Sequence, residues 1–282
     1  MALDSRSRNA LRIASPEDIS LKELRYKYPT RPPLTLEAEV RQVSEAVKRG
    51  YPRLTLRPLR DDALSVVGYG PSLNETWDKI THPCISTSGA HDFLIDRGFV
   101  PDYHAQMDGR DHQAKFLEKP NKDVTYVMAS VCAAAVFDRL EGHKVLLWHN
   151  CHGQHILDWI GLNDPGGLLI AGGSNIGLSS IHIGGILGFR KFRLFGFDGN
   201  YRGNARHAGA HPDQVPQNRI KRCGWWTSPQ MSNACDEFIA LQQNPNLEFD
   251  VYGTSLLTTL LEWTSTQVRS STADSLAAVM YR

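Results

Sequence analysis

The segment ALSVVGYGPSL at residues 63–73 decides the fold. It opens with a short apolar run that ends at Gly68, which is typical of a strand buried on both faces of a parallel sheet. Pro71 and Ser72 then mark the start of a helix. Glycines let a backbone approach a ligand closely, and the free N–H groups at a helix start attract phosphate. We therefore predict a phosphate-binding turn at residues 68–72, although a purely structural turn would have the same pattern.

Short apolar runs of the same kind recur along the chain, with helical stretches between most of them. This alternation is typical of a Rossmann-like, doubly wound α/β fold with a mostly parallel sheet. We predict one main domain at residues 61–262, after an extension with a short helix at residues 1–60 and before a tail at residues 263–282. The other strands are expected at residues 83–87, 103–107, 124–129, 144–148, 168–171, 191–197 and 249–252, and helices at residues 36–47, 73–80, 90–97, 131–140, 175–187 and 229–242.

The composition narrows the class of protein. Hydrophobic residues make up 41% of the 282 residues and charged residues 22%, so the chain can bury an ordinary core. The net charge of +1 gives no overall field that would attract nucleic acid or an anionic membrane. No apolar run reaches the ~20 residues of a membrane span, and the polar N-terminus does not read as a secretory signal. We expect a cytoplasmic protein whose five scattered cysteines are reduced.

A second strand-to-helix turn contains Gly172, Gly173, Ser174 and Asn175. Ser174 or Asn175 is a natural N-cap, and two such turns can face one nucleotide. The alternative is that the small residues of this turn and of the following helix only allow tight packing on the sheet.

Acidic residues follow two of the predicted strands, Asp108 after residues 103–107 and Asp198 after residues 191–197. Open α/β sheets bind ligands at this carboxyl edge. Each carboxylate is a candidate for holding a ribose, ordering a loop or sharing a metal such as Mg²⁺ with the other, and each also has the plain alternative of capping a turn.

The long stretch at residues 198–228 has no sustained periodicity, and a loop of this length inside a domain is often functional. It contains His207 and His211. Their spacing would suit a metal on a helix, but Gly209 and Pro212 argue against a helix there. We prefer His207 as a general base, with an idle surface histidine as the alternative.

Two other clusters leave alternatives open. The segment HNCHGQH at residues 149–155 matches no standard zinc spacing, so we prefer Asn150 or His152 as residues that line an acceptor pocket. Trp225 and Trp226 follow several basic residues and suit either a platform for rings and phosphates or packing of the loop onto the domain.

An ordered series of motifs resembles the MptE-like family. The series comprises GYGPSL at residues 68–73, GFVPD at residues 98–102, Gly-Ser at residues 173–174 and LGFRKFRLFGFD at residues 187–198. This family groups archaeal 6-hydroxymethylpterin diphosphokinases with bacterial flagellin glycosyltransferases of the motility-accessory-factor type, and it is similar in plan to small bacterial sialyltransferases.

The resemblance implies a nucleotide bound across both glycine turns, with an acceptor approaching over the long loop. In the glycosyltransferase branch the strand-end aspartate is followed by a tyrosine and then by His-Ala, as are Asp198, Tyr201 and His207 here. The sialyltransferase-type base has no counterpart, because residues 225–229 contain no histidine. The resulting catalytic set is His207, Asp198 and Tyr201, and the nucleotide-binding set is Gly68, Gly70, Pro71, Ser72, Ser88, Asp108, Gly172, Gly173, Ser174 and Asn175.

We therefore expect a nucleotide-dependent transferase. The favoured form is a glycosyltransferase that moves a sugar from a CMP- or NDP-sugar donor to an acceptor hydroxyl. The alternatives are an ATP-dependent pyrophosphokinase acting on a pterin-like alcohol with Mg²⁺, and a nucleotide-binding module without catalysis. One fold with one phosphate-binding edge serves all three, so the residues alone do not separate them.

Overall fold

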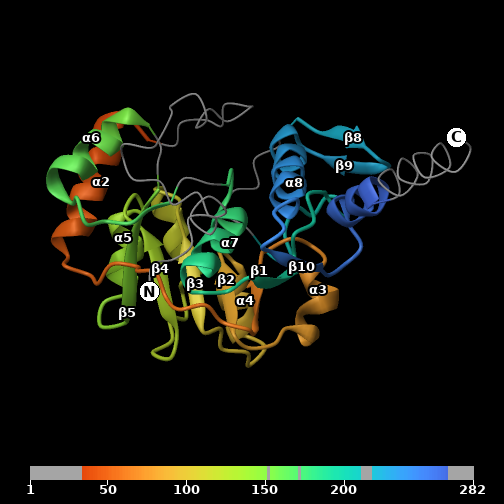
Figure 1. Cartoon of the computed structure of the whole chain (residues 1–282), viewed down its shortest axis with the longest axis horizontal. Helices are drawn as coiled ribbons and strands as arrows, with labels where there is room; N and C mark the ends of the chain where they lie inside the picture. Colours follow the sequence, from red (N-terminus) through yellow and green to blue (C-terminus); the bar gives the residue numbers. More distant parts are fainter. Residues whose placement is uncertain (1–33, 151–152, 171–172, 211–217, 266–282) are drawn as a thin grey trace, which may run out of the picture.

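The computed structural model describes residues 34–150, 153–170, 173–210 and 218–265. Its centre is an eight-stranded sheet in the order β10-β7-β1-β2-β3-β4-β5-β6, in which every strand pair is parallel (Figure 1). The predicted α/β fold is confirmed, and each predicted strand is present. The strands are β1 (Ala63–Val67), β2 (Cys84–Thr87), β3 (Tyr103–Gln106), β4 (Thr125–Ala129), β5 (Lys144–Asn150), β6 (Leu169–Ile170), β7 (Lys191–Phe195) and β10 (Glu248–Val251).

The order of the strands reverses at β1. From β1 to β6 the chain adds strands in one direction, and it then returns to place β7 on the other side of β1. Val67, the last residue of β1, is level with Ser86 of β2 and with Phe195 of β7. Open α/β sheets bind ligands outside the carboxyl ends of the strands at such a reversal. The fold therefore directs attention to the turns after β1 and β7.

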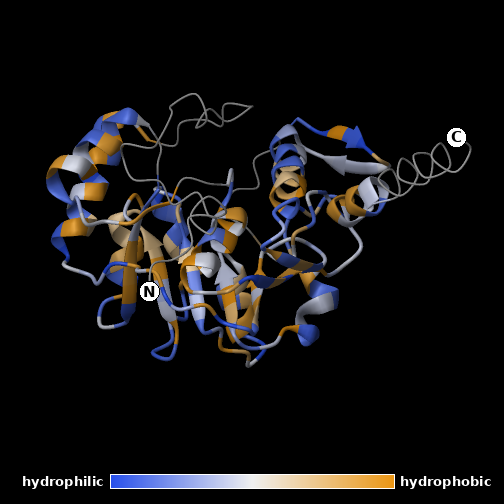
Figure 2. Cartoon of the chain, in the orientation of Figure 1, coloured by the Kyte–Doolittle hydropathy of each residue, from blue (hydrophilic) through white to orange (hydrophobic). Residues whose placement is uncertain are grey.

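Helices cover both faces of the sheet. Successive side chains of β1 point to opposite faces of the sheet. Leu64 lies against Gly184 of α7 (Ile176–Ile186), whereas Val67 belongs to an apolar cluster with Phe93 of α4 (Ala90–Ile95). Figure 2 shows apolar residues gathered in the strands. The other helices include α2 (Leu36–Lys48), α3 (Leu73–Thr76), α5 (Ala134–Arg139), α6 (Gln154–Asn163), α8 (Pro229–Gln242) and two 3-10 helices, η2 (Trp77–Lys79) and η3 (Asp111–Phe116), and residues 256–265 are also helical.

The two ends of the sheet carry different additions. Helices α2, α5 and α6 pack together at the end formed by β4 to β6, while α8 covers the other end, where Phe238 packs on Phe249 of β10 (Figure 1). Within the described parts of the chain, no helix is long and apolar enough to cross a membrane.

The sequence missed one hairpin, helix α6 and a helix at residues 256–265. The predicted irregular loop at residues 198–228 contains the antiparallel pair β8 (Ile220–Arg222) and β9 (Trp225–Thr227). Cys223 and Gly224 connect these strands with φ angles of 47° and 85°, the geometry that Asn-Gly usually signals. Helix α6 was also missed, because its N-cap Gly153 makes no side-chain capping bond.

Candidate functional site

The first glycine turn is packed against the turn that follows β7. Gly68 and Gly70 donate their N–H groups to the carbonyls of Phe195 and Gly196, at 2.8 and 3.0 Å. A Cβ at Gly70 would overlap a carboxylate oxygen of Asp198. Glycine is required at this position because the backbone of one turn lies directly on the other. The predicted phosphate donors of Gly68 and Gly70 are therefore bonded within the protein.

Asp198 holds the start of α3. Its carboxylate accepts the N–H of Ser72 at 3.1 Å, and its backbone carbonyl accepts the N–H of Leu257. The residue is only 3% exposed. Burial raises the pKa of the Asp198 carboxyl to about 6, and the hydrogen bonds with Ser72 oppose that rise. Asp198 thus joins the two turns and carries a charge that depends on pH near neutrality.

His207 lies over the first turn. Its imidazole stacks on the ring of Tyr69, with centroids 5.8 Å apart and planes inclined by 22°. The backbone fixes this position, because Ala208 N–H donates to the Tyr69 carbonyl at 2.9 Å and Asn74 Nδ2 donates to the Ala208 carbonyl at 2.8 Å. The structure therefore brings the predicted base onto the predicted turn, from segments that are far apart in the sequence.

The second turn already binds an anionic group. The N–H of Ser174 donates to Oε2 of Glu237 in α8 at 2.8 Å. Asn175 is the N-cap of α7, and its side chain accepts the N–H of Leu178 at 3.0 Å. Gly173 has a φ of 84°, a left-handed conformation that favours glycine. Sequence reasoning missed Glu237, because a single glutamate in a helix gives no local signal of a contact with a turn 63 residues away.

Ser88 and Asp108 lie at the carboxyl ends of β2 and β3. Ser88 has a φ of 46°, which is rare for a residue with a side chain and is often found at functional sites. Asp108 pairs with Arg110 and accepts Gln113 Nε2 at 3.0 Å. Among the described residues, no group of three His, Cys, Asp or Glu side chains is arranged to hold a metal ion.

Tyr201 packs within the long loop at residues 198–228. The side chain is 7% exposed, and the guanidinium of Arg219 lies 4.3 Å from the ring centroid. Its N–H donates to the Trp226 carbonyl at 2.8 Å, which ties residue 201 to β9. The structure places Tyr201 in the packing of the loop against β9.

Trp225 and Trp226 differ in role: one packs the loop onto the domain, and the other is exposed as a ring platform would be. Trp225 packs against the core and donates its indole N–H to Thr259 Oγ1 at 3.1 Å. Trp226 is 51% exposed and lies opposite Lys221 on the hairpin. Trp225 therefore packs the loop onto the domain, and of these two tryptophans only Trp226 is exposed enough to meet a ligand.

His149 belongs to a buried chain of hydrogen bonds. Its Nδ1 is 2.8 Å from Ser130 Oγ and its Nε2 is 2.9 Å from Asp164, which also pairs with Arg53. Burial lowers the pKa of His149, although Asp164 opposes that effect. Ser130 is fully buried. This chain has the residue types of a nucleophilic triad, but its burial assigns it to joining β4, β5 and the segment after α6.

Some predicted residues remain to be placed. Asn150 is buried, with its amide 3.6 Å from Met107 Sδ. Gly172, His152 and His211 lie outside the described residues. The structure thus brings Gly68, Gly70, Pro71, Ser72, Asp198 and His207 into one cluster, and it places Ser174 and Asn175 at the second turn.

These features define a Rossmann-like α/β protein with two glycine turns at the carboxyl edge of its sheet. A family model described as "6-hydroxymethylpterin diphosphokinase MptE-like" matches residues 39–204, more than half of the sequence, so the chain belongs to the MptE-like family. This confirms the resemblance seen in the motifs.

Solved structures give two likenesses. The MAf glycosyltransferase from Magnetospirillum magneticum AMB-1 is similar over 79% of this chain, with 18% identity and a TM-score of 0.57. The match spans 38% of that protein's length, and at this identity it shows only that the two chains share a fold. A mammalian sialyltransferase matches 89% of this chain and 86% of its own, with 12% identity and a TM-score of 0.41. No curated protein matches the sequence.

Proposed function

We propose that this chain is a nucleotide-dependent transferase that moves a sugar from a CMP- or NDP-sugar to an acceptor hydroxyl. The observation that carries the proposal is the position of His207, stacked on Tyr69 above the first turn and fixed there by backbone hydrogen bonds. The fold shared with the MAf glycosyltransferase supports the same assignment.

In this proposal the donor phosphates bind at the second turn. The N–H of Ser174 at the start of α7 now meets a carboxylate oxygen of Glu237, so the turn is able to receive a negatively charged oxygen. A phosphate oxygen would take the place of that carboxylate, where the helix start favours negative charge. The first turn instead gives the site a rigid side, because the Asp198 carboxylate accepts the Ser72 N–H and so fixes the turn that contains Tyr69.

His207 acts as the general base in this scheme. Its imidazole accepts the proton of the acceptor hydroxyl while the hydroxyl oxygen forms a bond to the anomeric carbon of the donor sugar. The bond from that carbon to the phosphate oxygen breaks, and the nucleotide leaves with the electron pair. Backbone N–H groups at the second turn stabilise the charge that develops on the leaving phosphate. Asp198 and Tyr201 position the turn and the loop.

A second candidate function comes from the description of the family model, which names a diphosphokinase. The chain would then transfer pyrophosphate from ATP to a pterin-like alcohol, with Mg²⁺ on the phosphates. The same base would serve, because both reactions remove a proton from an alcohol. A nucleotide-binding module without catalysis is the third candidate.

A thermal-shift panel separates these candidates. CMP, UDP, GDP and ATP are each tested with and without Mg²⁺, because a ligand that binds only the native state raises the melting temperature. A shift with CMP or UDP that does not need metal supports the sugar transferase, and a shift with ATP that requires Mg²⁺ supports the diphosphokinase. If none of the four shifts the melting temperature, the proposal of a nucleotide-dependent enzyme fails.

A further inference from the structure

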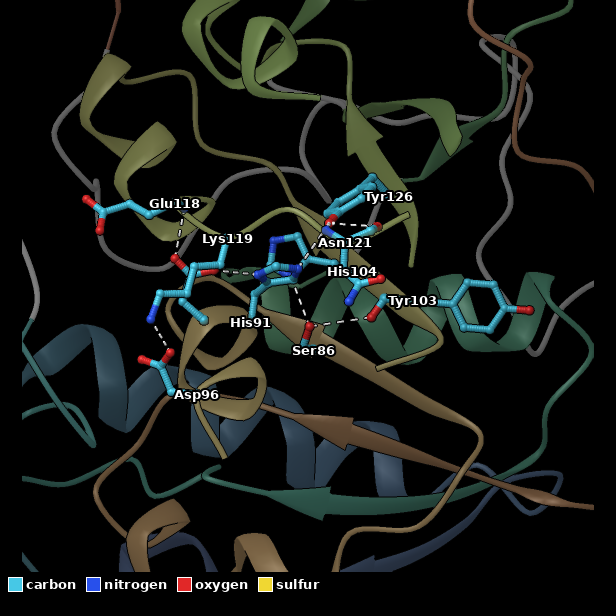
Figure 3. A network of polar contacts seen from close by, with 10 residues as sticks. Ser86, His91, Asp96, Tyr103, His104, Glu118, Lys119, Asn121 and Tyr126 are labelled. Atoms are coloured by element: carbon cyan, nitrogen blue, oxygen red, sulfur yellow. Dashed lines mark hydrogen bonds and ion pairs between the residues drawn. The ribbon is translucent and has the colours of Figure 1, made fainter. Parts of the chain in front are cut away.

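Strand β3 carries two buried polar side chains, His104 and Gln106, on the face of the sheet that packs against α4. His104 belongs to a network shown in Figure 3: its Nδ1 is 3.0 Å from Ser86 Oγ, and its ring packs on that of His91, which lies 3.2 Å from the Tyr126 hydroxyl. Burial lowers the pKa of His104 well below its ordinary value, so the imidazole is neutral. The imidazole two residues before Gln106 is therefore polar and uncharged, while the network beyond it ends at the carboxylate of Asp92, 2.6 Å from His91 Nδ1.

Gln106 ends β3 at the carboxyl edge, and its amide is unsatisfied. The side chain is 1% exposed, and neither Nε2 nor Oε1 has a hydrogen-bond partner among the residues that the structure describes. A buried donor or acceptor without a partner costs about 1–3 kcal/mol. Such a cost at the end of a strand calls for an explanation, and ligand binding is one.

Gln106 lies on the same face of the sheet as Tyr69. His104, two residues before Gln106 in β3, packs on His91 of α4, and side chains two positions apart in a strand point to the same face, so Gln106 also faces α4. The ring of Tyr69 accordingly packs edge-on against Phe93 and Phe116, at 6.1 and 6.5 Å between centroids.

The residue after β3, Met107, faces the other side of the sheet, where α7 lies. Met107 Sδ lies 3.4 Å from Ser179 Oγ in α7, whose first residues follow the turn. A ligand with its phosphates at Ser174 would therefore have to pass over the carboxyl edge of the sheet for its ring to meet Gln106, and open α/β sheets bind ligands across that edge.

We propose that Gln106 recognises the heterocyclic ring of the ligand, through a ring edge that presents one donor and one acceptor. This inference rests on the proposed function and adds the chemistry of recognition. A phosphate offers only acceptors and would leave Oε1 unpaired, whereas the –CO–NH– or N=C–NH₂ edge of a nucleobase or a pterin satisfies both ends of the amide. The aromatic ring of Tyr69 at the same edge suits a flat partner.

The test compares wild type with Gln106→Leu, which keeps the approximate volume and removes both polar atoms. Calorimetric titration with CMP, UDP, GDP, ATP and 6-hydroxymethylpterin measures affinity, and thermal unfolding measures stability without ligand. We expect Gln106→Leu to bind its ring ligand roughly tenfold to a hundredfold more weakly and to unfold at a higher temperature, because an unsatisfied amide has been removed. Loss of nucleotide binding would assign the recognised ring to the donor, and loss of pterin binding would assign it to the acceptor.

Ser180→Ala is the matched control. The Ser180 hydroxyl is also fully buried and without a partner in the described structure, but it lies in α7 on the opposite side of the sheet. This variant should keep wild-type affinity. Unchanged affinity in Gln106→Leu, with a lower melting temperature, would show a structural amide and overturn the inference while leaving the proposed function intact. If Gln106→Leu does not fold, Gln106→Met repeats the test with a closer match in shape. Wild type that binds none of the nucleotides overturns the proposed function itself.

Discussion

Replacing Asp198 by asparagine should increase stability near neutral pH and reduce function. The carboxylate is 3% exposed and its pKa is raised to about 6, so at pH 7 the protein carries a buried negative charge. Asparagine keeps an oxygen that can accept the Ser72 N–H, and it carries no charge. The variant therefore separates the hydrogen bond from the charge.

The magnitude follows from the difference in pKa between the two states. A carboxyl with a pKa of about 6 when folded and 3.8 when unfolded contributes stability that is present below pH 3.8 and is lost as the pH rises through 6, about 3 kcal/mol in all. Other titrating groups are shared by both proteins. The free energy of unfolding of Asp198→Asn minus that of wild type should therefore rise by about 2.5 kcal/mol between pH 4 and pH 7.5, because a small part of the total is already lost at pH 4.

Urea denaturation followed by tryptophan fluorescence measures this difference at several pH values. The exposed carboxylate of Asp123 provides the control, and Asp123→Asn should show no such rise. In the same preparation, Asp198→Asn should lose at least tenfold in donor affinity or turnover, about 1.4 kcal/mol. A stability difference that stays constant with pH would refute the reasoning, because it would mean that water reaches the carboxylate. Full activity in the variant would reduce Asp198 to a structural cap.

Three further substitutions test the site. His207→Ala should retain donor binding but lose 10²- to 10⁴-fold in turnover, with His211→Ala as the control. The wild-type rate should fall on acidification, because only a neutral imidazole accepts a proton. If both variants keep the wild-type rate, this loop supplies no base. Gly70→Ala should destabilise the chain by about 1–3 kcal/mol in urea denaturation, because the new Cβ would overlap the carboxylate of Asp198. Gly161→Ala in α6 is the control: it has open space around its Cβ and should gain stability. Equal effects of the two substitutions would contradict the packing of the first turn. Glu237→Gln should bind the donor about fivefold more tightly in calorimetry, because a competing charge is gone, and weaker binding would place the phosphates elsewhere.

The fold was predictable because buried parallel strands are short apolar runs, and even the two-residue β6 lies in one. The cap of α7 was equally local, since Asn175 bonds to a residue only three positions away. Local patterns do not describe the hairpin of β8 and β9, whose turn uses Cys223 instead of asparagine. The domain boundaries stay a prediction.

Sequence alone could name candidate positions for the site, but it could not give their contacts. Glycine turns and strand-end acids can be read from sequence, because their residue types are restricted. The bond between Ser72 and Asp198 joins residues 126 positions apart, so nothing near either residue indicates it. Gln106 gave no signal, because a single glutamine at the end of a strand is common and only its burial without a partner makes it unusual.

The return of the chain to β1 also determines when this site can form. Strand β7 pairs with β1 only after five other strands have been synthesised, and until then one edge of β1 has no neighbour within the sheet. Such pairing across a long stretch of chain is slow, and an open edge invites association with other chains. Pairing of β7 with β1 and assembly of the first turn are then the same event, because Asp198 follows β7 and brings its hydrogen bonds with it. A nascent chain that stops before residue 191 would present an exposed strand and lack the contact of Asp198 with the first turn, so that turn should become ordered in one step late in folding.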